Sequence, residues 1–158
     1  MAIDRARQNI VDHAKATSAD RILFIDDDTL IPLDTVETLE GVLLAHPKAV
    51  SASGVCYQRG YPWMPMLYKF EDFDWMKGRL SNQLIPPLPE EPFQVSANGM
   101  GICLMKTELL EKVEGDCFGR ESKGTEDFFF YKKAHEAGLE AWCHPKAVAV
   151  HLGERLRV

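Results

Sequence analysis

The stretch that decides the fold is RILFIDDD, residues 21–28, a short apolar run followed directly by three aspartates. An apolar run of this length, rich in Ile, Leu and Phe, is typical of a buried β-strand. Open α/β sheets bind ligands at the carboxyl ends of their strands. Adjacent carboxylates repel one another, and a divalent cation relieves that repulsion. Asp26, Asp27 and Asp28 therefore predict a cation site, although a solvated acidic turn explains the triplet alone equally well.

Helical and extended patterns alternate on both sides of this strand. Alternation of this kind predicts an α/β domain with a layered sheet. The chain has 158 residues, enough for one domain with a real core but not for two. The predicted helices span residues 3–16, 35–45, 107–113 and 126–137, and the predicted strands span residues 21–25, 49–56, 101–105, 139–143 and 147–151.

Residues 57–93 interrupt the alternation and are rich in proline and aromatic side chains. A loop of this length inside a compact domain is usually either functional or disordered, and its aromatic content argues against disorder. We therefore expect a partly ordered excursion that lines a cleft. It divides the single domain, residues 1–158, into a first half over residues 1–56 and a second half over residues 94–158.

The composition excludes several classes of function. The formal net charge of -6 makes a broad basic surface for nucleic acid or anionic membranes unlikely to form. No apolar run approaches the roughly 20 residues that cross a bilayer, and the polar N-terminal stretch is not a secretory signal. The four cysteines include no C-x-x-C pair, which indicates reduced, mostly buried thiols in a cytoplasmic protein.

A second acidic group, Glu126-Asp127, follows Thr125 at the start of a predicted helix. Acidic residues commonly stabilise a helix N-terminus, and that structural role explains the pair by itself. The helix dipole should also lower the pKa of a carboxylate there, which would keep it ionised and able to accept a proton. His151 ends the last apolar run, AVAVHLG, and a histidine in that position is more often structural than a ligand.

Taken together, these residues resemble the GT-A fold of family 2-like nucleotide-sugar glycosyltransferases. The resemblance implies a Rossmann-like layered sheet with helices on both faces. The matching stretches occur in the order of the family: ARQNIVDHA (6–14), ILFIDDDTLIPLDTVETL (22–39), SANGMGICLMKTELLEKV (96–113) and GTEDFFFYKKAHEAGLEAWCHPKAVAVHLG (124–153).

The resemblance assigns the acidic triplet to the donor, a nucleoside-diphosphate sugar. Asp26 would lie near the donor ribose and share the metal, Mn²⁺ or Mg²⁺, which Asp28 would hold through the diphosphate. Asp27 is the middle residue of this D-x-D motif. His151 resembles an additional metal ligand.

The resemblance assigns the second half of the chain to a hydroxyl acceptor. Asp127 resembles the general base that deprotonates the acceptor, with Glu126 beside it. Asn98, Gly99 and Gly101 would lie near the sugar and the acceptor. The expected reaction is a hexosyl transfer, and the E-D pattern favours inversion.

The sequence also departs from the family, which usually has two or three strands before the first matching helix. Those strands carry the nucleobase pocket, so we expect a partial GT-A sheet and weak nucleotide binding. The strand over residues 21–25 should then have an open edge. We expect a second copy of the chain or a partner chain to cover it.

Two other functions remain open. The chain could be a non-catalytic or partner-dependent module with the same fold. It could also be an aspartate-nucleophile phosphatase of the haloacid-dehalogenase type, whose strand ends in D-x-D-x-T. Here Thr29 follows Asp28 directly, so the spacing is one residue short of that pattern.

Overall fold

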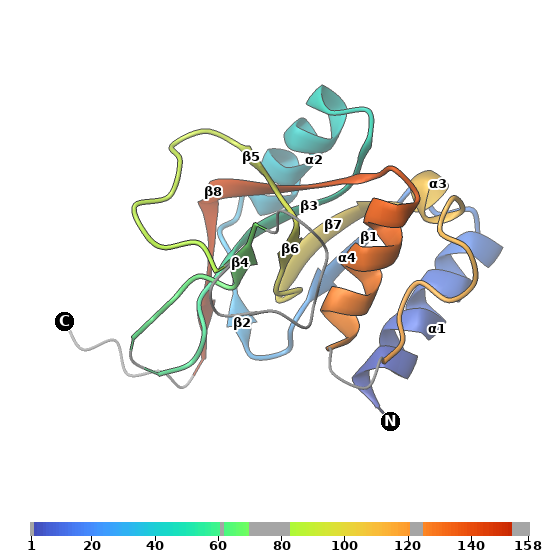
Figure 1. Ribbon diagram of the computed structural model, residues 1–158, viewed down its shortest axis with the longest axis horizontal. Coiled ribbons are helices and arrows are strands. Elements are labelled where there is room, and N and C mark those ends of the chain that lie inside the picture. Colours follow the sequence, from blue (N-terminus) through green and yellow to red (C-terminus); the bar gives the residue numbers. More distant parts are fainter. Residues whose placement is uncertain (1, 61, 70–82, 121–124, 153–158) are drawn as a thin grey trace.

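A mixed sheet lies at the centre of the molecule, with helices on both faces (Figure 1). The structure is a computed structural model that describes residues 2–60, 62–69, 83–120 and 125–152. The central sheet has six strands: β1 (Arg21–Ile25), β2 (Thr29–Leu30), β3 (Ala49–Cys56), β5 (Phe93–Val95), β7 (Ile102–Lys106) and β8 (Glu140–His151). A smaller sheet pairs β4 (Leu67–Tyr68) with β6 (Ala97–Asn98).

The strand order explains where the candidate residues lie. The order is β1-β7-β3-β8-β2, and β5 pairs with β8 beside this path. β3 and β8 are parallel, whereas β7 runs antiparallel to both of its neighbours, β1 and β3. β1, which leads into the acidic triplet, is therefore an edge strand of the described sheet. The predicted α/β class is confirmed.

β8 is one continuous strand, so the prediction of two separate strands over residues 139–143 and 147–151 was wrong. Proline lacks the N–H that a ladder needs, so Pro145 can lie inside a strand only where its N–H position is not paired. The pairing with β3 passes from Cys143 to Val148, which leaves Pro145 between two stretches of ladder. The β8 backbone also comes close to β3 there, because a Cβ on Gly54 would lie 2.1 Å from the Ala147 carbonyl oxygen.

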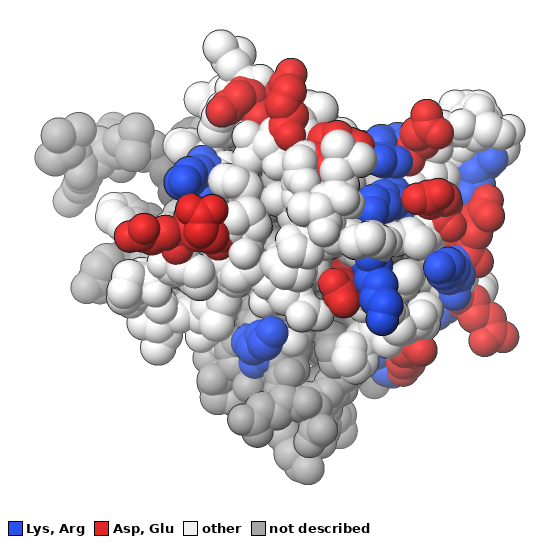
Figure 2. All heavy atoms as spheres, turned by 90° about the horizontal axis from the view of Figure 1, so that it is seen from above, with Lys and Arg blue, Asp and Glu red and all other residues white. Residues whose placement is uncertain are grey.

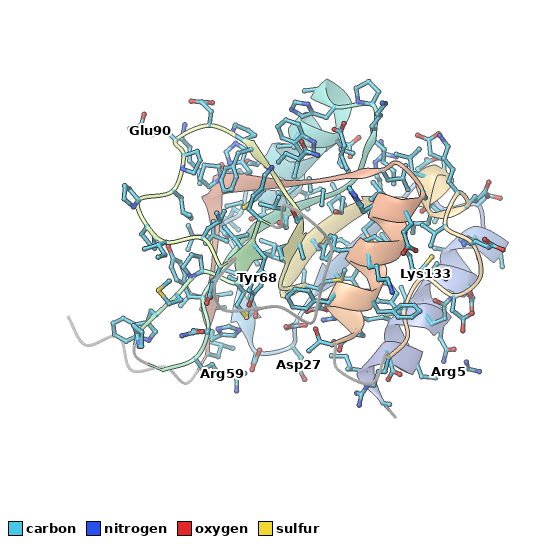
Figure 3. All side chains as sticks on the ribbon, viewed as in Figure 1. Arg5, Asp27, Arg59, Tyr68, Glu90 and Lys133 are labelled. Carbon is cyan, nitrogen blue, oxygen red and sulfur yellow. The ribbon has the colours of Figure 1, made fainter. Side chains whose placement is uncertain are left out.

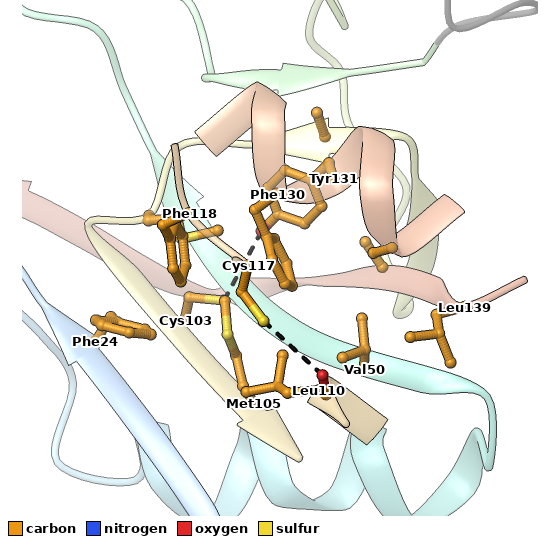
Figure 4. Packing of buried hydrophobic residues seen from close by; sticks show 14 of the residues in the cluster. Phe24, Val50, Cys103, Met105, Leu110, Cys117, Phe118, Phe130, Tyr131 and Leu139 are labelled. Carbon is orange, nitrogen blue, oxygen red and sulfur yellow. Dashed lines mark hydrogen bonds between the residues drawn. The ribbon is translucent and has the colours of Figure 1, made fainter. Parts of the chain in front are cut away.

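The helices divide between the two faces of the sheet. α1 (Ile3–Ala16), α3 (Thr107–Leu110) and α4 (Glu126–Glu136) contribute to one hydrophobic core, and α2 (Thr35–Ala45) contributes to the other. Phe24 of β1 meets Phe118 edge-on at 5.7 Å, and Phe118 stacks on Phe130 of α4 at 5.2 Å (Figure 4). This aromatic row fixes α4 against β1, and so fixes the position of the residues that begin α4.

The predicted excursion over residues 57–93 is only partly described. Residues 61 and 70–82 lie outside the described residues. The described parts fold back on themselves through bridges between Tyr57 and Pro65 and between Tyr68 and Gln83. β4 then pairs with β6, which places this segment next to the chain entering β7. Its expected role in lining a cleft stays a prediction, as does the division of the domain into two halves.

The cysteines match their prediction, since all four are buried and free. Burial raises the pKa of Cys56, Cys103 and Cys143 to about 12, so these thiols are poor nucleophiles at neutral pH. No helix among the described residues is long and apolar enough to cross a membrane. Acidic and basic side chains are interspersed on the face seen in Figure 2, which shows no continuous basic surface.

Candidate functional site

Arg7 is the residue around which the candidate site is organised. It lies on the buried face of α1, at helical spacing with Val11 and Ala14, and only 6% of the residue is exposed. Its guanidinium carbon lies 6.0 Å from the centre of the Phe24 ring, within cation–π range. A buried arginine needs anionic partners, because the desolvation of an unpaired charge is costly.

Those partners come from two distant parts of the chain. Arg7 Nη2 lies 3.3 Å from Asp26 Oδ1, at the end of β1. Arg7 Nη1 donates to Glu126 Oε1 at 3.0 Å and also contacts Asp127 Oδ1, both in the first turn of α4. One guanidinium thus connects the predicted donor end of the site with the predicted acceptor end.

Asp127 does not have the depressed pKa that its position at a helix N-terminus predicted. Burial raises the pKa of Asp127 to about 7, although the charge of Arg7 opposes this shift and that of Glu126 adds to it. Desolvation therefore outweighs the opposing charge of Arg7. The correction leaves Asp127 able to exchange a proton near neutral pH.

The second part of the triplet faces the surface. The Asp28 carboxylate forms an ion pair with Arg59, and the Asp28 carbonyl accepts a 2.6 Å hydrogen bond from the Leu152 amide. β2 pairs with β8 so that Thr29 lies opposite His151. Asp28 and His151 are therefore neighbours along the backbone ladder, although they are 123 positions apart in sequence. Asp27 is exposed, at the rim seen in Figure 3.

The three small or amide residues of the second half lie in and beside the loop that enters β7. Asn98 is buried, and its amide donates to the Gly99 carbonyl at 2.7 Å while its Oδ1 has no partner. A Cβ on Gly99 would lie 2.9 Å from Met66 Cε, so Gly99 allows close packing there. A Cβ on Gly101 would lie 3.3 Å from Asp26 Oδ2, so Gly101 leaves room beside that carboxylate.

The donor chemistry of this region fits a hard divalent cation. The end of β1 offers the three carboxylates of Asp26, Asp27 and Asp28, and Gly101 leaves space next to Asp26. Among the described residues, however, no three His, Cys, Asp or Glu side chains already converge as a ligand set. Both outer aspartates instead contact an arginine, Asp26 with Arg7 and Asp28 with Arg59.

Two residues of this region, Arg7 and Arg59, had no assigned role in the sequence-based prediction. The sequence gives a weak signal for Arg7, whose i, i+4 and i+7 spacing with Val11 and Ala14 places it on the same helical face as two apolar side chains. No local signal marks Arg59. Its contact with Asp28 depends on how the segment after β3 folds back, which the pattern of apolar residues does not encode.

Comparison with solved structures gives low-identity matches over nearly the whole chain. A197 from STIV has a TM-score of 0.69 at 17% identity, over 96% of this chain and 68% of that one. GalNAc-T7, crystallised with UDP, GalNAc and Mn²⁺, has a TM-score of 0.67 at 13% identity, over 96% of this chain and 30% of that one. The fold is GT-A-like.

The likeness ends at the fold. This chain spans less than a third of the length of GalNAc-T7. No protein-family model matches the sequence, and no curated protein matches it either. The expected layered sheet with helices on both faces is confirmed, whereas the roles of individual residues are not tested by these comparisons.

Proposed function

We propose that the chain is a divalent-metal-dependent glycosyltransferase domain, which transfers a sugar from a nucleoside-diphosphate donor to a hydroxyl acceptor. The observation that supports this most is the buried Arg7, which holds Asp26 and Asp127 around one guanidinium. A transferase of this type needs donor and acceptor groups fixed close together, because correct orientation accounts for much of the rate.

In this proposal Asp127 accepts the proton of the acceptor hydroxyl as its oxygen attacks the anomeric carbon. A base with a pKa of about 7 suits that role at neutral pH. Glu126 and Arg7 keep the Asp127 carboxylate in position. Asp28 and Asp26, with His151 beside them, would hold a divalent cation, which when bound would supply Lewis-acid stabilisation of the charge on the departing diphosphate.

In this proposal Asn98, Gly99 and Gly101 lie near the sugar and the acceptor. We further propose that inversion of the anomeric centre accompanies transfer and that the protein acts in the cytoplasm.

Among the described strands β1 pairs with β7 alone, and we propose that a second copy or a partner chain adds to its outer edge. Size-exclusion chromatography with light scattering tests that last point, and a monodisperse monomer at micromolar concentration would contradict it.

One observation favours a second candidate, a non-catalytic module with the same fold. Arg7 and Arg59 already neutralise the carboxylates that the reaction requires. In a module of this kind both ion pairs would be permanent structural contacts. No observation among the described residues favours the phosphatase alternative.

The two candidates are separated by incubating the protein with a panel of nucleoside-diphosphate sugars and measuring release of the nucleoside diphosphate. The transferase proposal predicts release with Mn²⁺ and none with EDTA. Release that is equal in Mn²⁺ and EDTA would contradict metal dependence. Absence of release with every donor, in the presence of Mn²⁺ and a panel of sugar acceptors, would favour the module.

A further inference from the structure

The ion pair between Arg59 and Asp28 involves an exposed arginine, whereas Asp26, Glu126 and Asp127 pair with the buried Arg7. Arg59 belongs to the segment that follows β3, and it reaches the end of β1 from outside the sheet. The segment folds back through a hydrogen bond of 2.9 Å, in which the backbone N–H of Gln58 donates to the Met64 carbonyl. Gly60, with φ of 84°, allows the reversal that directs Arg59 toward Asp28.

This ion pair is exposed on its arginine side and half-buried at Asp28. Arg59 has 63% of its side chain exposed, and Asp28 has 34%, whereas the corresponding value for Arg7 is 7%. Exposed ion pairs are weak and are screened by salt. The guanidinium of Arg59 can therefore leave Asp28 without uncovering a buried charge. Arg7 cannot leave Asp26 and Asp127 in the same way.

We propose that Arg59 is a displaceable counter-ion, which occupies the Asp28 carboxylate in the metal-free protein and gives it up when a divalent cation binds. The inference rests on the proposed metal-dependent function and adds a residue that regulates it. A carboxylate oxygen engaged by a guanidinium is not free to bind a cation, so Arg59 competes directly with the metal.

The competition makes a signed prediction about metal affinity. Loss of the Arg59 side chain should strengthen metal binding, because Asp28 is then free, and an exposed pair accounts for a change of up to about fivefold. R59K keeps the positive charge but not the planar fork of the guanidinium, so it should fall between the wild type and R59A. Raising the salt concentration should bring the metal affinities of wild type and R59A closer together, because salt screens the ion pair.

The experiment is a titration of the full chain with Mn²⁺ alone, followed by electron paramagnetic resonance of the free ion. The matched control is R5A, which removes the same charge from an exposed position on α1 that lies apart from Arg59 in Figure 3. R59A should bind Mn²⁺ two- to fivefold more tightly than wild type, by the size of an exposed ion pair. R5A should bind it as wild type does. The same R59A change in a D28N background should have no effect, since the two residues act as a pair.

Each result decides a different point. Equal or weaker Mn²⁺ binding by R59A, with normal binding by wild type, would overturn the role of Arg59 and leave the proposed function intact. An equal gain for R5A and R59A would reduce the effect to net charge and would also overturn it. Failure of every variant to bind Mn²⁺ at millimolar concentration would overturn both the inference and the metal-dependent function.

Discussion

Arg7 and Arg59 both meet candidate acidic residues at the end of β1, but they do so in opposite environments. Arg7 approaches from the interior, packed over Phe24, and contacts Asp26, Glu126 and Asp127. Arg59 approaches from the surface and contacts Asp28. Removing one partner of a buried ion pair leaves an uncompensated charge, whereas an exposed pair separates at little cost.

The difference suggests that the two ends of the site have different tasks. The buried end is a fixed framework that holds the proposed base at a set position. The exposed end is the proposed exchangeable position, at which a divalent cation would replace Arg59 beside Asp28. Four experiments test whether the ends really differ in this way, and they follow in order of decreasing expected effect.

The largest effect is expected for the proposed base. D127N should lower sugar transfer by about 10²- to 10⁴-fold, the usual contribution of a general base, and should leave Mn²⁺ binding unchanged. The measurement is the initial rate of nucleoside-diphosphate release with saturating donor. E136Q, an exposed change near the other end of α4, is the control and should retain full activity. Unchanged transfer by D127N would remove Asp127 from the reaction.

The second effect concerns stability. R7A should lower the free energy of unfolding by about 3–5 kcal/mol, because it leaves the mostly buried carboxylates of Glu126 and Asp127 without their cation. Urea denaturation followed by tryptophan fluorescence measures this value. The matched control is R5A, an exposed arginine on the same helix, which should change it by less than about 0.5 kcal/mol. A loss below about 1 kcal/mol for R7A would contradict the structural role of the buried Arg7 ion pairs.

The third effect is a pH dependence that belongs to the buried end. Burial raises the pKa of Asp127 to about 7 in the folded protein, from its ordinary value of 3.8. Between these two values the folded state binds one more proton than the unfolded chain, so the free energy of unfolding should fall as pH rises from about 4 to 7. Sugar transfer should rise through the same region, because the base must be ionised.

Urea unfolding of wild type and D127N at pH 5 and pH 8 isolates this contribution. D127N should reduce the difference in stability between the two pH values, since asparagine does not titrate. An identical difference in both proteins would show that Asp127 does not hold its proton near neutral pH.

The smallest effect is expected at the exposed end. R59A should change the free energy of unfolding by no more than about 1 kcal/mol, as is usual for surface ion pairs. Thermal denaturation monitored by circular dichroism is sufficient to measure it. If R59A lowered the free energy of unfolding as much as R7A does, Arg59 would be a structural residue and the two arginines would not differ in role.

Local patterns predicted the elements of this fold well. The predicted helix over residues 3–16 and the predicted strands over residues 21–25 and 49–56 coincide with α1, β1 and β3. Each is defined by its own apolar pattern, which needs no knowledge of the rest of the chain. The continuous β8 was not predicted, because the tolerance of Pro145 depends on a gap in its pairing with β3.

The buried face of α1 shows a similar limit. Ile3 and Ile10 match the helical apolar spacing, yet they are 44% and 47% exposed, while Arg7 is buried. Which face packs inward depends on the acidic partners that β1 and α4 bring to it. The same is true of Asp127, whose pKa follows from its burial and not from its place in the helix. The sequence pattern therefore located the acidic residues but not their charge partners.

Binding of Mn²⁺ to wild type, D28A and D127N is the most direct test of the central claim, that a metal end and a base end are separate parts of one site. Electron paramagnetic resonance of free Mn²⁺ measures all three under identical conditions. The account predicts one site in wild type, the same affinity in D127N, and loss of binding in D28A. Equal binding by wild type and D28A, or no binding by wild type, would contradict it.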